Sequence, residues 1–181
     1  MSLCIHALCT YHGNDAPNSL CTISPDLNHG PSAVFKHMEA MLEGDQRSKI
    51  ENFHGLSDSP STQYRNKTMF AIMLKKMIPT FPNLKSFSWT YSEPGHGKGP
   101  VDGVGASLKR KCDSHVAYGH DVANFEQFEK CVQEIEGIKI ISVHSITDQQ
   151  LIDEMRKIEV QVKGELKLLA FYQQIIDKKN Y

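Results

Sequence analysis

Two aspartates and a histidine occupy the positions in this sequence that are best suited to chemistry. Asp58 directly follows residues 50–57, which read as a strand, and a carboxylate at the carboxyl end of a strand stands where α/β sheets place their ligands. His96 lies in the glycine-rich loop 95–99, and Asp102 follows six residues later, in the first turn of a predicted helix. Three glycines and a proline around His96 indicate backbone that is held close to a ligand.

Each of these residues also has a structural interpretation. Asp58 could open a turn or cap the next helix, and Asp102 could complement the dipole of its own helix. The loop is not a nucleotide-triphosphate P-loop, because the lysine of that motif is followed by Ser or Thr whereas Lys98 is followed by Gly99.

Two glycines in the helix that follows the loop, Gly103 and Gly105, cost roughly 1 kcal/mol each relative to alanine. They predict either tight packing of this helix or a ligand that approaches its start.

The charge is unevenly distributed along the chain. Residues 65–111 contain nine Lys or Arg and two acidic residues, a net charge of +7, so the remainder carries −8 of the total of −1. A local positive field is what a surface that binds a polyanion needs, although a solvated basic face without a partner has the same composition. Lys109, Arg110 and Lys111 form the densest basic run and are candidate nucleic-acid contacts.

Hydrophobic periodicity predicts alternating strands and helices. Strands are expected over residues 3–11, 19–24, 50–57, 87–91 and 138–143, and the first two should form a hairpin. Helices are expected over residues 32–42, 66–78, 101–116, 125–135 and 147–157, with Pro79 and Pro82 closing the second and Thr147 capping the last. For the last twenty residues the pattern is compatible with either a helix or a strand. This order favours an α/β or α+β sheet with helices packed on it.

The motifs, in this order, resemble ribonuclease H. In that fold an Asp in a T/S-D-S context ends the fourth strand, a G-H-x-G loop follows the fifth, and an Asp opens the final helix. Here the same places hold Ser57-Asp58-Ser59, then the strand with Trp89, then the loop with His96, then Asp102. The sequences SDSPSTQYRN (57–66) and GHGKGPVDGVG (95–105) also resemble a group of transposon-derived, transposase- or integrase-like animal proteins. The resemblance covers roughly residues 3–143.

The resemblance implies an α/β fold with a ribonuclease H-like mixed sheet flanked by helices. It also implies that the protein acts on nucleic acid, with DNA as the preferred partner. It also implies two-metal phosphodiester chemistry with Mg²⁺ or Mn²⁺. Asp58 would bridge both ions and Asp102 would hold one. His96 would move protons or help the product leave, and Lys98 and Arg65 would neutralise phosphates.

The sequence departs from the family pattern in three places. The first strand, which normally carries the first catalytic Asp, has no counterpart, so the chain is expected to lack that strand. The second acid of the family has three alternatives: Glu39 on the first helix, or Asp26 or His29 just before it. Ser59 stands where a Gly is usual. These departures favour a nuclease-like domain with impaired catalysis. Two other interpretations of the sequence stay open: a non-catalytic module that binds nucleic acid or protein, and an α/β protein unrelated to ribonuclease H.

Composition bounds the remaining expectations. The chain has 181 residues, of which 40% are hydrophobic and 23% charged, which is typical of a globular domain. Residues 1–145 are expected to form the ribonuclease H-like domain and residues 146–181 a C-terminal extension. There is no apolar run of membrane-spanning length and no signal-peptide pattern, so an intracellular, nuclear location without a membrane partner is expected. The five cysteines are expected to be free thiols.

Overall fold

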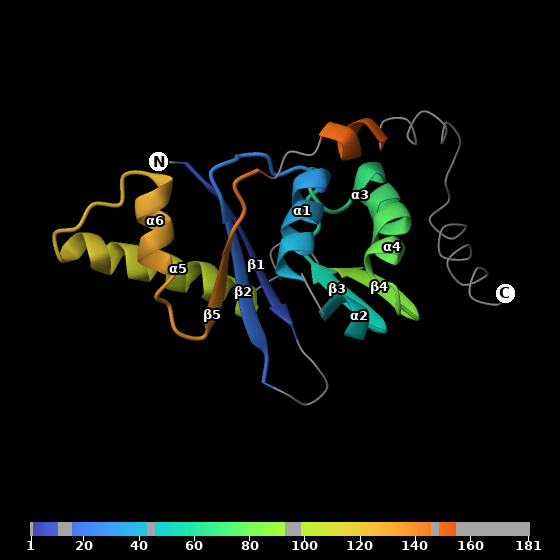
Figure 1. Cartoon of the computed structure of the whole chain (residues 1–181), viewed down its shortest axis with the longest axis horizontal. Helices are drawn as coiled ribbons and strands as arrows, with labels where there is room; N and C mark the ends of the chain where they lie inside the picture. Colours follow the sequence, from blue (N-terminus) through green and yellow to red (C-terminus); the bar gives the residue numbers. More distant parts are fainter. Residues whose placement is uncertain (1, 11–15, 43–45, 93–98, 146–148, 155–181) are drawn as a thin grey trace. The chain divides into compact units, whose positions relative to one another are not determined.

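The chain is a mixed α/β protein with two small sheets flanked by helices (Figure 1). The computed structural model describes residues 2–10, 16–42, 46–92, 99–145 and 149–154. The chain divides into two compact units, one made of residues 1–42 and 95–147 and the other of residues 43–94 and 148–181. The α/β class predicted from periodicity is therefore confirmed, and the domain boundary predicted at residue 145 stays a prediction. No helix among the described residues is long and apolar enough to cross a membrane.

The first unit is built on a three-stranded mixed sheet. Its strands are β1 (Cys4–Thr10), β2 (Asn18–Ser24) and β5 (Ile138–Ser142), in the order β1-β2-β5. The predicted hairpin is confirmed, because β1 and β2 pair antiparallel, and β5 joins the other edge of β2 in parallel.

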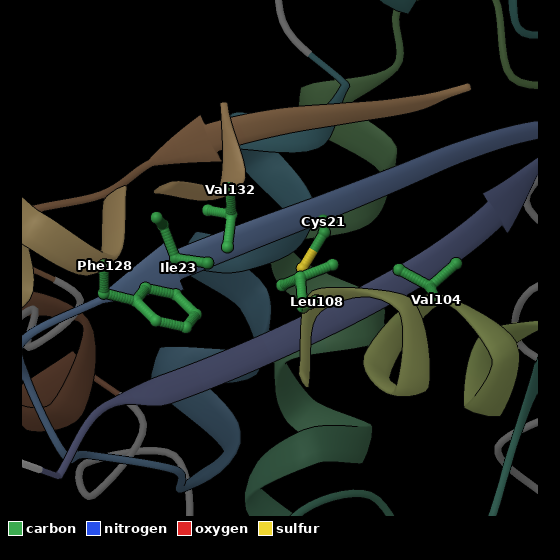
Figure 2. Close-up of a cluster of buried hydrophobic side chains, with 6 residues drawn as sticks. All are labelled: Cys21, Ile23, Val104, Leu108, Phe128 and Val132. Carbon is green, nitrogen blue, oxygen red and sulfur yellow. The ribbon is translucent and has the colours of Figure 1, made fainter. Parts of the chain in front are cut away.

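The central strand β2 is buried on both faces, because helices cover the sheet from both sides. Alternation along the strand directs Cys21 and Ile23 toward one face and Thr22 toward the other. Helices α5 (Pro100–Ala117) and α6 (Phe125–Val132) cover the first face, and α1 (Pro31–Met41) covers the second. Figure 2 shows the core on the first face, which consists of Cys21, Ile23, Val104, Leu108, Phe128 and Val132.

Local signals at the helix ends explain where α5 and α6 begin. Pro100 is the first residue of α5, a position that its missing N–H and fixed φ suit, and Gly99 precedes it as N-cap. Asn124 caps α6, because its side-chain oxygen accepts a hydrogen bond from the backbone N–H of Gln127 at 2.9 Å. α6 ends at Val132, before the predicted residue 135, and Gly137 takes a positive φ of 76° in the turn to β5.

The second unit contains a two-stranded parallel sheet. Its strands are β3 (Asn52–Ser57) and β4 (Ser86–Tyr91), in a register that places Gly55 opposite Trp89. The other elements of this unit are α2 (Gln46–Lys49), α3 (Lys67–Ile72), η1 (Met73–Met77), α4 (Ile78–Thr80) and a helix over 149–154.

The predicted helix 66–78 is present as three consecutive segments. Of the two prolines predicted to close it, Pro79 lies inside the helix, which continues to Thr80 and ends before Pro82, with the π-helix η1 directly before α4. A proline inside an α-helix has no N–H to bond and clashes with the carbonyl one turn earlier. The wider π turn changes the bonding pattern at this point, which is how the chain continues in helical form past Pro79.

An aromatic cluster stabilises one face of the β3–β4 sheet. The Trp89 indole lies across the backbone of Gly55, where an added Cβ would meet Trp89 Cε3 at 2.5 Å. The same ring stacks on Phe53 and Tyr64 at centroid distances of 6.2 and 6.3 Å. Its Nε1–H donates to Ser57 Oγ at 3.0 Å. Gly55 is therefore required by the close approach of a ring rather than by its backbone conformation.

Gly103 and Gly105 make no packing contact with the described part of the chain, which corrects the expectation of tight packing. A Cβ built at either position meets no described atom within 4 Å outside its own helix turn. Both lie inside α5, so we expect Gly103→Ala and Gly105→Ala each to stabilise the protein by about 0.5–1 kcal/mol through the helix propensity of alanine. Chemical denaturation followed by circular dichroism measures this. A loss of stability in both variants would indicate that something packs against this surface of α5.

Candidate functional site

Asp58 occupies the place that the sequence indicated. It directly follows β3 at the carboxyl end of the parallel pair β3–β4, and its side chain is exposed. It does not cap the next helix. That role belongs to Asn66, whose side-chain oxygen accepts a hydrogen bond from Met69 N at 2.8 Å. The carboxylate of Asp58 is thus presented to solvent at the edge of the sheet where ligands of α/β proteins bind.

Asp102 performs the structural role that the sequence allowed. It is the third residue of α5, and its Oδ2 accepts a hydrogen bond from the backbone N–H of Gly99 at 3.1 Å. The Asp102 N–H donates in turn to the Gly99 backbone carbonyl at 3.1 Å, so Asp102 supplies the N3 half of a capping box whose other half glycine, without a side chain, cannot provide. A carboxylate at this end of a helix is also stabilised by the helix dipole. One of the two proposed metal ligands therefore has a local structural function.

The three alternatives for the second acid are engaged near α1. Glu39 forms an ion pair with Lys36 at 3.1 Å. Asp26 Oδ1 accepts a hydrogen bond from Asn28 N at 3.0 Å, in the turn that leads into α1. His29 Nδ1 lies 3.0 Å from the Leu27 carbonyl oxygen. All three belong to the same unit as Asp102, whereas Asp58 belongs to the other unit.

The described residues do not bring together a cluster of ligands for Mg²⁺ or Mn²⁺. Mg²⁺ demands near-octahedral oxygen coordination, and protein sites supply one or two carboxylates together with waters or substrate phosphates. Among the residues that the structure describes, no group of three or more His, Cys, Asp and Glu could hold a metal ion. His96 and Lys98 lie outside the described residues. The predicted approach of Asp58 to Asp102 stays a prediction, and no catalytic step follows from this geometry.

The residues predicted to contact nucleic acid differ in whether their positive charge is free to interact with a phosphate or is already paired within the protein. Arg65, Lys109 and Arg110 are exposed, although Arg110 Nη2 donates to Ser107 Oγ at 3.0 Å. Lys111 instead lies 3.5 Å from Glu134 Oε2 in an ion pair between α5 and the turn that follows α6. Lys109 and Arg110 are therefore the better candidates on α5, because part of the field of Lys111 is cancelled by its partner.

Sequence reasoning missed a buried polar network beneath α1. His37, with 1% of its surface exposed, places its Nδ1 2.7 Å from Thr22 Oγ1 and its Nε2 3.6 Å from Cys4 Sγ. Its ring stacks on that of His6 at 5.3 Å and an interplanar angle of 7°. His37 lies on the apolar stripe of its helix, and Cys4 and His6 share one face of β1. These polar residues on otherwise apolar faces are the sequence signal that could have predicted the network.

The hydrogen bonds determine the tautomer of His37. Thr22 Oγ1 donates its one proton to the His6 carbonyl at 3.2 Å, so it must accept from His37 Nδ1–H. Nε2 is then the acceptor that faces the Cys4 thiol. Burial lowers the pKa of His37 to about 4, although the charge of Asp26 opposes this, and burial together with His37 lowers the pKa of His6 to about 4.

This network has the arrangement of a nucleophile, a base and an orienting group, but its chemistry is structural. Burial, and then the charge of Asp26, raises the pKa of the Cys4 thiol. A thiol whose pKa is raised is a poor nucleophile, because the thiolate is the reactive species. The network therefore satisfies polar groups that would otherwise be buried without partners.

Comparison with known proteins assigns a family. No curated protein and no solved structure matches the chain. A family model described as a domain of unknown function (DUF8701) matches residues 1–173, which is nearly the whole chain. The chain therefore belongs to the DUF8701 family.

Proposed function

We propose that this chain is a transposon-derived, ribonuclease H-like domain that binds nucleic acid through its sugar-phosphate backbone and whose metal-dependent cleavage chemistry is impaired. The observation that carries the proposal is the parallel pair β3–β4, with Asp58 exposed at its carboxyl end. Arg65 lies in the loop that follows Asp58, and Lys67 opens α3. Both side chains are exposed. Cations at this edge of a parallel sheet suit a phosphate ligand.

The charge of the second unit supports the same proposal. Its described residues, 46–92 and 149–154, contain seven Lys or Arg and four acidic residues, a net charge of +3. Ion pairs engage two of the cations, Lys85 with Glu51 and Lys76 with Glu154. The net positive field that remains attracts phosphates without regard to base sequence. The partner that we propose is DNA, and the location that we propose is the nucleus.

The proposal that cleavage is impaired rests on where the candidate carboxylates lie and what they bond to. Asp102 caps its own helix, and each alternative for the second acid has a local partner, whereas Asp58 is exposed. Two-metal cleavage needs several carboxylates directed at the same pair of ions. A domain that keeps its Lys and Arg side chains but assembles such a metal site poorly still binds nucleic acid and loses most of its cleavage rate.

A salt series tests the binding proposal. We expect fluorescence anisotropy with a labelled DNA duplex to give micromolar or weaker affinity near physiological salt, falling by about 0.9 log units per log unit of salt for each phosphate contact. Replacing Arg65 and Lys67 with Gln should weaken binding and flatten this slope by up to about two contacts' worth. Replacing Lys109 and Arg110 with Gln tests the α5 surface separately.

The control removes the same charge from the opposite end of the sheet. Lys49 and Lys85 are exposed near the amino ends of β3 and β4, so the Lys49→Gln/Lys85→Gln variant should keep the wild-type slope. Equal slopes for all variants, or no binding at low salt, would refute the proposal. Nicking of supercoiled plasmid in Mn²⁺, abolished by Asp58→Asn, would instead show that cleavage survives.

A further inference from the structure

Four aromatic rings form a continuous layer on one face of the β3–β4 sheet. They belong to Phe53, Tyr64, Phe87 and Trp89, and we call them the aromatic platform. Neighbouring rings have centroids 5.6–6.3 Å apart and planes inclined by 19–40°. Directly superposed rings would have centroids only about 3.5–4 Å apart, the optimal separation of carbon atoms. The rings therefore overlap only in part and spread over the sheet as a layer.

The platform is fixed in position but only half-buried. The indole of Trp89 lies across the backbone of Gly55, and its Nε1–H is bonded to Ser57 Oγ at 3.0 Å. The neighbouring Phe81, which contacts the ring of Phe53 at 5.8 Å, exposes 2% of its surface and is a true core residue. The rings of the platform are not covered to this extent. They present rigid apolar surface to solvent, which is the property of an aromatic contact surface.

Exposed cations lie beside the platform. Tyr91 Oη donates a hydrogen bond to the backbone carbonyl of Tyr64 at 3.0 Å, which holds the segment after β3 against β4. Arg65 follows Tyr64 directly, and Lys67 lies two residues further on. The side chains of both are exposed. Positive charge and aromatic surface are therefore presented together at this edge of the sheet.

We propose that the aromatic platform stacks on the bases of single-stranded DNA while Arg65 and Lys67 contact its phosphates. The inference rests on the proposed function, to which it adds the strandedness of the ligand. A single strand exposes the faces of its bases, whereas each base of a duplex is covered by its neighbours and leaves the stack only at a cost in free energy. Every base has an aromatic face, so this contact needs no particular sequence. The adjacent cations favour a polyanion over an apolar peptide as the occupant.

The fluorescence of Trp89, the single tryptophan of the chain, reports stacking directly. We expect an oligothymidylate of about 12 nucleotides to quench this fluorescence, and a duplex of equal length to leave it unchanged. The decisive comparison is an abasic strand of equal length, which carries the same phosphates without bases. The oligothymidylate should bind at least about fivefold more tightly than the abasic strand, which is the smallest gain expected from stacking one base on an aromatic ring.

A variant of the platform separates base contacts from phosphate contacts. Tyr64 contributes its ring from outside the two strands, so Tyr64→Ala should leave the β3–β4 pairing in place. We expect it to weaken binding of the oligothymidylate about 5- to 150-fold and to leave binding of the abasic strand unchanged. Tyr118→Ala is the matched control, because it removes an aromatic side chain that is 84% exposed in the other unit and should change neither affinity. Circular dichroism checks that both variants fold.

The outcomes distinguish this inference from the proposed function. Equal affinity for the oligothymidylate and the abasic strand, or a bound complex in which Trp89 is not quenched, would overturn the stacking contact and leave backbone binding in place. Tighter binding of a matched RNA strand would overturn the assignment to DNA. If no strand and no duplex binds at low salt, the proposed function fails together with this inference.

Discussion

Acidification from about pH 7 to about pH 4 is expected to destabilise the first unit selectively. The pKa of His6 and of His37 is lowered from 6.5 to about 4 in the folded chain, chiefly by burial. Between these values the unfolded chain binds protons that the folded chain does not, so the free energy of unfolding falls as the pH falls. Each histidine contributes a slope of up to about 1.4 kcal/mol per pH unit.

The stacked geometry explains why protonation is unfavourable here. A proton on His37 Nε2 would face the Cys4 thiol, and Nδ1–H is already used by Thr22. Protonation of both His6 and His37 would place two cationic rings 5.3 Å apart. The carboxylate of Asp26 offsets part of this cost, because its charge raises the pKa of His37. The stability that these histidines contribute is therefore complete above about pH 6.5 and is lost as the pH falls toward 4.

Hydrogen exchange of β1 and β2 peptides across this pH range, corrected for the intrinsic rate, measures the effect. The fluorescence of Trp89 serves as an internal comparison, because the single tryptophan of the chain lies in the other unit. His37→Gln should lower protection at neutral pH and reduce the slope with pH. His120→Gln, at an exposed position outside the network, should leave both unchanged. Equal pH slopes for wild type and His37→Gln would contradict the assignment.

The second large effect is expected for Gly55→Ala, with a loss of about 1–3 kcal/mol in the free energy of unfolding. At an open site in a strand this substitution would stabilise by about 0.5–1 kcal/mol, because alanine loses less backbone entropy on folding. Here the new Cβ would lie 2.5 Å from Trp89 Cε3 and 2.8 Å from Cδ2. The indole must move, which breaks its hydrogen bond to Ser57 and its stacking on Phe53.

Chemical denaturation and the emission spectrum of Trp89 report this change, which should shift the emission to longer wavelength. A double-mutant cycle with Trp89→Leu separates the clash from other causes, because Gly55→Ala should cost little once the indole is gone. Circular dichroism replaces fluorescence in the variants without tryptophan. A Gly55→Ala protein at least as stable as the wild type would show that the ring does not lie on Gly55.

Local patterns predicted most of the elements, because their signals lie within a few neighbouring residues. Alternation predicted the β1–β2 hairpin, and the apolar stripe of residues 101–116 predicted α5. Asp58 was placed correctly because a strand end is visible in the sequence. The π-helix before Pro79 and the absence of packing at Gly103 were not predictable, since both depend on how a helix meets its surroundings.

The sequence by itself determined the alternating strands and helices, the basic segment 65–111 and the strand-end position of Asp58. Only the tertiary structure decided which side chains meet. It brings His37 next to Thr22 and Cys4, and it turns the Asp102 carboxylate back onto Gly99. The physical reason is that periodicity specifies which face of an element is buried, whereas the partner on that face depends on the packing of elements distant in the chain.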